Sequence, residues 1–154
     1  MGKKQLPEEF KEFIQSLNKN KVKYLLVGGW AVGIYGHPRA TKDIDFLFSN
    51  DKKNLDRIKK ALDEFGAPPI DLEKFKEDGY VIRIGSSPIQ IDLINSADGI
   101  EINDCFERKK IMDIEDVKVN VIAIDDLIIN KKSSARNIDI ADAEKLEKQK
   151  TIKK

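Results

Sequence analysis

VKYLLVGGWAVGIYGHPRATKDIDFLF, residues 22–48, places two glycines and two closely spaced acids between apolar runs. The run VKYLLV is rich in strand-forming residues and stops at a Gly-Gly pair, which predicts a strand that ends there. The segment WAVGIYG predicts a short helix, with Gly29 near its beginning and Gly36 at its end. The run DIDFLF predicts a second strand. The stretch therefore combines strands and a helix over a short length, which indicates a mixed fold.

Asp43 and Asp45 stand one residue apart in the second predicted strand. Because side chains alternate along a strand, both acids are expected on one face, with Ile44, Phe46 and Phe48 facing the core. Two carboxylates this close repel each other, and one pKa rises unless a cation lies between them. Mg²⁺ prefers such oxygen ligands. The alternative is the solvent face of an edge strand, where acids oppose aggregation.

The rest of the chain adds helices and strand pairs. Helices are predicted at residues 6–20, 49–66, 101–110, 124–135 and 137–149, strands at 80–85 and 88–95, a strand pair at 110–124, and a loop with at most one helical turn at 67–79. No internal repeat or linker interrupts this order. It predicts an α+β fold in a single domain over residues 1–154, with a basic tail that frays from about residue 148.

Length and composition limit the class of protein. The chain has 154 residues, about one domain, and its 40% apolar and 36% charged residues are typical of a globular protein. The net charge of +1 provides no overall attraction toward nucleic acid or membrane. The one cysteine, Cys105, excludes an internal disulfide. No apolar run is long enough for a signal core or a membrane span, so we expect a cytoplasmic protein without a membrane partner.

A third acid, Asp92, lies in the predicted strand at residues 88–95. If that strand pairs near residues 43–48, Asp92 joins Asp43 and Asp45 around the same metals. Three carboxylates around two ions roughly 3.5–4 Å apart are the usual arrangement for nucleotidyl transfer.

Residues around the first two acids suit phosphate binding. Gly28 and Gly29 lie between a strand and a helix, where backbone N–H groups can approach phosphate oxygens. Arg39 and Thr41, just before Asp43, add a cation and a hydroxyl. The Arg39 side chain can instead pair with an acid when no metal is bound.

These residues resemble the nucleotidyltransferase superfamily, in the minimal form related to polymerase-β-like enzymes. The shared pattern is a glycine pair after a strand, then Asp-x-Asp, then a later acid on another strand. Residues 36–45 are especially similar to bacterial members known as AbiEii-toxin-like proteins.

A later pattern supports the same resemblance, which extends from about residue 22 to 146. Relatives often carry Leu-Ile-x-x-Lys, then an Arg and two acids, and this chain has Lys131, Arg136, Asp139 and Asp142 at that spacing. It departs from the relatives at two positions: Ala135 stands where a Gly is common, and Ile138 where a Lys is common.

The resemblance implies a mixed β-sheet flanked by helices and an Mg²⁺-dependent transfer of an NMP from an NTP to an acceptor hydroxyl, with release of pyrophosphate. It implies two Mg²⁺ ions at Asp43, Asp45 and Asp92, with Asp92 also a candidate base. The implied phosphate contacts are Gly28, Gly29, Arg39, Thr41, Lys131 and Arg136. The acceptor stays open: an antibiotic, an RNA end or a protein side chain fits the same core.

Other interpretations remain beside this one. The chain is small and shows no separate acceptor-binding domain, so it can be a catalytically silent fold that binds a protein partner in a toxin–antitoxin or phage-defence pair. A homodimer can also build the acceptor cleft from two chains, and a monomer is equally consistent. His37 is either a phosphate or acceptor contact or an exposed loop residue. Trp30 and Cys105 are expected to pack in the core.

Overall fold

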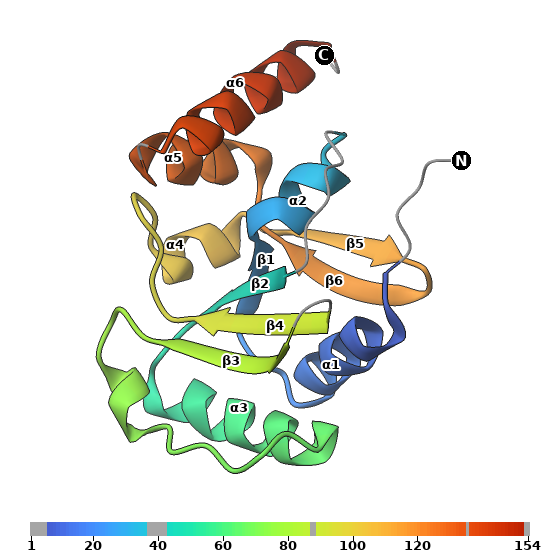
Figure 1. The fold of residues 1–154 in the computed structure, drawn as a ribbon, viewed down its shortest axis with the longest axis vertical. Coiled ribbons are helices and arrows are strands. Elements are labelled where there is room, and N and C mark those ends of the chain that lie inside the picture. Colours follow the sequence, from blue (N-terminus) through green and yellow to red (C-terminus); the bar gives the residue numbers. More distant parts are fainter. Residues whose placement is uncertain (1–5, 37–42, 87–88, 135, 153–154) are drawn as a thin grey trace.

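Figure 1 shows the chain as a computed structural model, which describes residues 6–36, 43–86, 89–134 and 136–152. The described elements are α1 (Glu8–Lys19), β1 (Tyr24–Val27), α2 (Gly28–Ile34), β2 (Asp43–Phe48), α3 (Lys52–Phe65), the 3₁₀ helix η1 (Glu73–Lys76), β3 (Val81–Ser86), β4 (Ile89–Ile94), α4 (Ile102–Glu107), β5 (Lys110–Ile114), β6 (Val117–Val121), α5 (Ile124–Ser134) and α6 (Asn137–Ile152).

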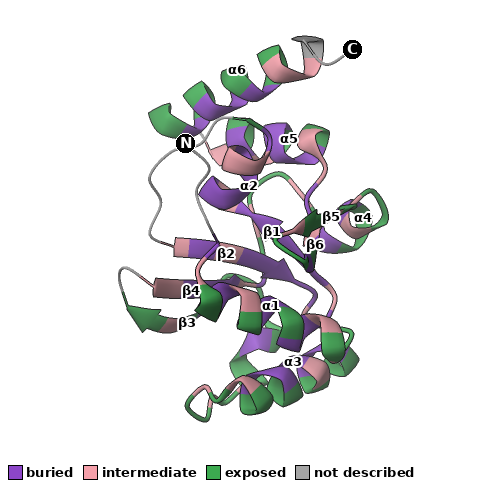
Figure 2. Cartoon of the chain, turned by 90° about the vertical axis from the view of Figure 1, so that its right-hand side faces the viewer, coloured by how far each residue is buried: buried purple, intermediate pink, exposed green. Residues whose placement is uncertain are grey.

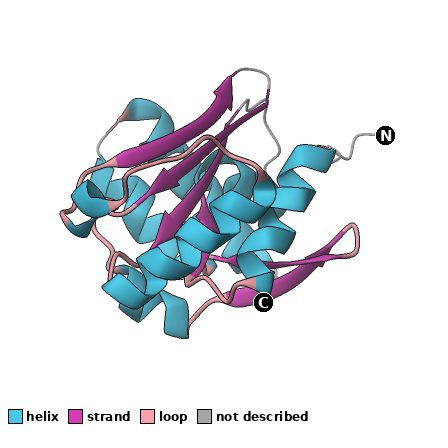
Figure 3. Cartoon of the chain, turned by 90° about the horizontal axis from the view of Figure 1, so that it is seen from below, coloured by secondary structure: helices cyan, strands magenta, loops and turns pink. Residues whose placement is uncertain are grey.

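The strands form one mixed sheet in the order β3-β4-β2-β1-β6-β5. Three neighbouring pairs are antiparallel: β3 with β4, β1 with β2, and β5 with β6. Two pairs are parallel: β2 with β4, and β1 with β6. The strands run between helices (Figure 3). The predicted α+β class, with a mixed sheet flanked by helices, is confirmed.

Local sequence signals explain where the elements begin and end. The Asp51 side chain accepts a hydrogen bond from the Asn54 N–H and caps α3, and Gly66, at φ 93°, ends it. Gly is favoured there because this backbone conformation is left-handed. The turn between β5 and β6 contains Glu115 and Asp116, which are also at positive φ.

The central strands are deeply buried: all four residues of β1 and four of the six residues of β2 are buried (Figure 2). Ile44, Phe46 and Phe48 of β2 are fully buried, as predicted from the alternation. The Phe13 ring of α1 packs against Phe46, with ring centroids 5.7 Å apart. Helices α1 and α3 lie together at one end of the molecule, whereas α5 and α6 lie at the other (Figure 1). The acidic face of β2 is thus the face opposite α1.

Two predicted boundaries differ from the structure. Helix α2 begins at Gly28, one residue before the predicted glycine. Helix α6 continues to Ile152, past the residue at which the tail is expected to begin to fray. The physical reason is contact with α5, because Lys150 forms an ion pair with Asp125 and Lys132 pairs with Glu147 at 2.7 Å. Within the described ranges, no helix has the length and apolar character needed to cross a membrane.

Candidate active site

Gly28 and Asp45 meet where β1 ends. In the antiparallel pairing of β1 with β2, Val27 lies opposite Asp45, and Gly28 follows directly. Gly28 has φ +70°, and a Cβ built on it would collide with the Asp45 Oδ2 atom. Both the backbone conformation and the close approach of the carboxylate therefore require glycine here.

Asp45 and Asp92 lie side by side on neighbouring strands. The parallel pairing of β2 with β4 places Asp45 opposite Asp92 and Asp43 opposite Gln90. Residues two apart on one strand share a face, so Asp43, Asp45 and Asp92 lie on the same face of the sheet. The sheet therefore gathers the three acids that the sequence singled out.

The carboxylates influence each other strongly. Burial, and after it the negative charges of Asp92 and Asp43, raise the pKa of Asp45 to about 6. The positive charges of Lys131 and Arg83 act in the opposite direction but do not cancel this effect. A site with more buried negative than positive charge favours a bound cation.

The donor set has the chemistry that Mg²⁺ prefers, since all three groups are carboxylates on adjacent strands. However, no group of three or more His, Cys, Asp or Glu side chains in the described part of the chain is arranged to hold a metal ion. Asp92 is bonded to protein donors: its Oδ1 accepts from Arg83 Nε at 3.0 Å, and both its oxygens accept from Gln90 Nε2 at 3.2 and 3.3 Å. The three acids therefore suit Mg²⁺ in their carboxylate chemistry and in their positions on adjacent strands. In this structure, however, the Asp92 carboxylate accepts hydrogen bonds from Arg83 and Gln90.

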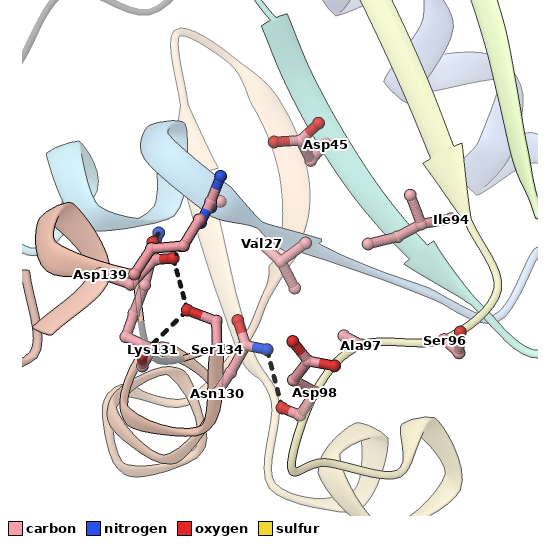
Figure 4. A pocket seen from close by; sticks show the side chains of 12 residues that line it. Val27, Asp45, Ile94, Ser96, Ala97, Asp98, Asn130, Lys131, Ser134 and Asp139 are labelled. Carbon is pink, nitrogen blue, oxygen red and sulfur yellow. Dashed lines mark hydrogen bonds and ion pairs between the residues drawn. The ribbon is translucent and has the colours of Figure 1, made fainter. Parts of the chain in front are cut away.

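A pocket of about 260 Å³ opens beside Asp45 and Gly28 (Figure 4). Its opposite wall comes from the loop after β4 and from helix α5. There the Asn130 Nδ2 donates to the Asp98 backbone carbonyl at 2.9 Å and joins the two segments. Ser134 also lines this wall. The pocket thus connects the acidic face of the sheet with the junction between α5 and α6.

Lys131 and Arg136 line the same pocket, but Lys131 is already paired within the protein. Its side chain is 6% exposed, and its Nζ lies 3.1 Å from Asp139 Oδ1 and 3.4 Å from Asp142 Oδ2. Arg136 is 72% exposed, and its Nε contacts Asp139 Oδ2 at 2.5 Å. The late motif therefore joins α5 to α6, and Arg136 is its solvent-accessible cation.

Asp139 is the centre of this internal cluster. Burial alone would raise its pKa, but hydrogen bonds from Arg136, Ser134 and Lys131 outweigh burial and lower the pKa to about 2. Asp139 is therefore a permanent anion at neutral pH that fixes both cations.

Other residues noted from the sequence have simpler positions. Arg39, Thr41 and His37 lie outside the described residues. Trp30 packs edge-on against Phe10, with ring centroids 5.9 Å apart, which confirms the core position. Cys105 is buried, and burial raises the pKa of its thiol, which fits a small apolar residue and not a nucleophile.

Sequence reasoning missed Arg83 and Gln90, which hold Asp92, and Asp98, Asn130 and Ser134, which line the pocket. A signal for the neighbourhood existed, since residues 80–85 and 88–95 were predicted as consecutive strands, and their antiparallel pairing places Arg83 opposite Asp92. The pocket residues come from segments that no local pattern connects.

A family model covers most of the chain. The model of a family described as "Nucleotidyl transferase of unknown function (DUF2204)" matches residues 7–154. No match was found among curated proteins.

Solved structures share the fold at low sequence identity. The lincosamide antibiotic adenylyltransferase LnuA, with lincomycin bound, has a TM-score of 0.60 and 14% identity, covering 94% of this chain and 98% of that chain. The antibiotic-resistance factor ANT(2″)-Ia has a TM-score of 0.59 and 14% identity, covering 94% of this chain and 88% of that chain. A second ANT(2″)-Ia structure, in complex with adenylyl-2″-tobramycin, has a TM-score of 0.56 and 14% identity, covering 92% of each chain.

Proposed function

Because the chain belongs to the nucleotidyl transferase family of unknown function (DUF2204), we propose that it moves an NMP from an NTP to an acceptor hydroxyl with Mg²⁺ held by Asp43, Asp45 and Asp92. Membership of this family identifies the chain as a nucleotidyltransferase. The metal ion, the nucleotide donor and the acceptor hydroxyl are what we propose beyond it. The observation that carries the proposal is the pairing of Asp45 with Asp92, beside Gly28, whose Cβ position the Asp45 carboxylate approaches closely.

The residues around the acids would position the donor. Gly28 begins α2 next to Asp45, so the triphosphate would lie against this turn, with Arg136 facing it across the pocket. Arg39 and Thr41 belong to the same proposal by their place in the sequence. Lys131 would act on phosphate charge from within its pair with Asp139 and Asp142.

Transfer itself is an in-line displacement at the α-phosphorus. The acceptor oxygen forms the new P–O bond, the bond to the β-phosphate oxygen breaks, and pyrophosphate leaves with that electron pair. Asp92 would take the proton of the hydroxyl. Bound Mg²⁺ would stabilise negative charge on the attacking and leaving oxygens. Most of the rate enhancement in such reactions comes from positioning and electrostatics.

Transfer of label from radioactive NTPs to a panel of acceptors tests this proposal. Because the similar structures include proteins with bound lincomycin and adenylyl-2″-tobramycin, lincosamides and aminoglycosides belong in the panel beside tRNA and proteins. We expect labelled product with wild type and Mg²⁺, and at least a hundredfold less with Asp45→Asn. Equal transfer by both proteins would contradict the assigned role of Asp45.

The engaged state of Asp92 also favours a second candidate, a catalytically silent fold that binds a protein partner of a toxin–antitoxin or phage-defence pair. An Asp43→Ala/Asp45→Ala variant separates the two. Full biological activity in that variant would support the silent fold, whereas its loss with an intact fold would support chemistry.

A further inference from the structure

Arg83 stands at the end of a row of paired strand positions on the acidic face of the sheet, which we call the acidic row. Strands β3, β4 and β2 are neighbours, and Arg83, Asp92 and Asp45 occupy directly paired positions along them. Side chains at paired positions project from the same face of a sheet. The acidic row therefore runs from Gly28, directly after β1, through Asp45 and Asp92, to Arg83 on the edge strand β3.

Arg83 is hydrogen-bonded to Asp92, one of the three proposed metal ligands. Its Nε lies 3.0 Å from Asp92 Oδ1, and the Asp92 side chain is only 8% exposed whereas the Arg83 side chain is 62% exposed. A buried carboxylate is costly unless a cation or several donors accompany it. Arg83, helped by Gln90, supplies that compensation in the metal-free chain.

Arg83 differs in its setting from Lys131, the cation that lines the pocket together with Asp45. Lys131 is buried and held by Asp139 and Asp142, whereas the Arg83 side chain is mostly exposed on the edge strand β3. Arg83 is therefore the cation that can leave when a stronger one arrives.

We propose that Arg83 is a positioning residue that acts as the counter-ion of Asp92 before metal binds and competes with the divalent cation for this carboxylate. The inference rests on the proposed metal site. A protein group that stabilises only the metal-free state lowers the apparent affinity for the metal by the same free energy. Arg83 thus keeps the acids together in the empty enzyme and weakens metal binding until the nucleotide contributes its own ligands.

The test uses Arg83→Gln and a matched control, Arg108→Gln. Arg108 is likewise more than half exposed and pairs with a buried acid, Asp126, through Nε at 2.9 Å and Nη2 at 3.0 Å, but Asp126 is not one of the proposed metal ligands. Mn²⁺ binding is measured by electron paramagnetic resonance without nucleotide, and the thermal midpoint is measured in chelator and in Mg²⁺.

We expect both variants to melt below wild type in chelator. Only Arg83→Gln should bind Mn²⁺ more tightly, by roughly two- to fivefold, as expected for loss of one partly exposed charge pair. The thermal midpoint of Arg83→Gln should also rise more on addition of Mg²⁺ than the midpoint of wild type does. Arg83→Lys, which keeps the charge, should bind Mn²⁺ close to wild type.

Unchanged or weaker Mn²⁺ binding by Arg83→Gln, with normal binding by wild type, would overturn the role of Arg83 and leave the metal site intact. Absence of Mn²⁺ binding in every protein would overturn the metal site, and with it the inference.

Discussion

At the scale of single residues, Gly28 carries the closest constraint in the site. Its φ of +70° disfavours any side chain, and the position of a Cβ is taken by the Asp45 carboxylate. Gly66 has a similar φ of +93°, yet nothing lies within 4 Å of its Cβ position. The two glycines therefore separate the cost of backbone conformation from the cost of collision.

Gly28→Ala should destabilise the chain by more than Gly66→Ala. The backbone cost of about 1 kcal/mol applies to both, whereas only Gly28→Ala must also displace Asp45. Chemical denaturation measures the free energy of unfolding, and Mn²⁺ titration measures the site. Equal losses in both variants, with unchanged Mn²⁺ binding, would show that the contact between Gly28 and Asp45 is not needed.

Asp139 predicts an acid-sensitive contribution to stability. Its pKa is lowered to about 2 in the folded chain, below the ordinary 3.8. The contribution is therefore complete above pH 3.8 and is lost as the pH falls through about 2. Wild type should lose free energy of unfolding between pH 4 and pH 2 more steeply than Asp139→Asn. Asp113→Asn, at an exposed acid paired with Lys118, serves as control and should keep the wild-type slope.

At the scale of elements, the α5–α6 pair depends on a buried charge cluster. Lys131 is enclosed between Asp139 and Asp142, whereas its neighbour Lys132 forms an ion pair with Glu147 in which both side chains are about half exposed. The two lysines are adjacent on one helix, so they differ mainly in burial.

Lys131→Met should cost roughly 3–5 kcal/mol of unfolding free energy, because it removes the buried cation that two buried carboxylates share. Lys132→Met should cost less than about 1 kcal/mol, as exposed pairs do. Urea titration of both variants measures the difference. A similar small loss in both would mean that Lys131 is not the link between the helices.

The strands also show which parts of the fold could be predicted from the sequence. Strand β2 was predicted at its observed residues, because Ile44, Phe46 and Phe48 alternate with the acids and fill the core. The β5–β6 pair was predicted as a strand pair within residues 110–124, because its two strands are neighbours in the sequence. The pairing of β2 with β4 is non-local, and alternation alone gives no register between strands so far apart in the chain. The acids could therefore be named, but their alignment could not be predicted.

The late motif shows the opposite case. Its spacing led to Lys131 and Arg136 as phosphate contacts, which remains a proposal. What spacing could not reveal is that Asp139 and Asp142 face Lys131 across the helix pair. Partner choice among several nearby charges depends on how α5 packs on α6, and that packing is decided by the whole core.

At the scale of the molecule, the chain as a whole is near charge balance, whereas the acidic row concentrates negative charge in one place. Ligands that bind only the folded state raise its stability by mass action. Binding of metal and nucleotide should therefore appear as a change in global unfolding.

Mg²⁺ with the preferred NTP should raise the stability of wild type by about 2.7 kcal/mol at a hundredfold excess over the dissociation constant. Differential scanning fluorimetry measures the shift, and a chelator should reverse it. Asp45→Asn should show little of it. A shift that persists in chelator would mean that the nucleotide binds without the metal.

Isothermal titration of wild type with ATP, GTP, CTP and UTP, each with and without Mg²⁺, addresses the role of the three carboxylates most directly. We predict binding of at least one nucleotide that requires Mg²⁺ and that Asp45→Asn abolishes. No heat with any nucleotide, together with no binding of Mg²⁺ or Mn²⁺, would contradict the assignment of Asp43, Asp45 and Asp92 as the metal site of a nucleotidyltransferase.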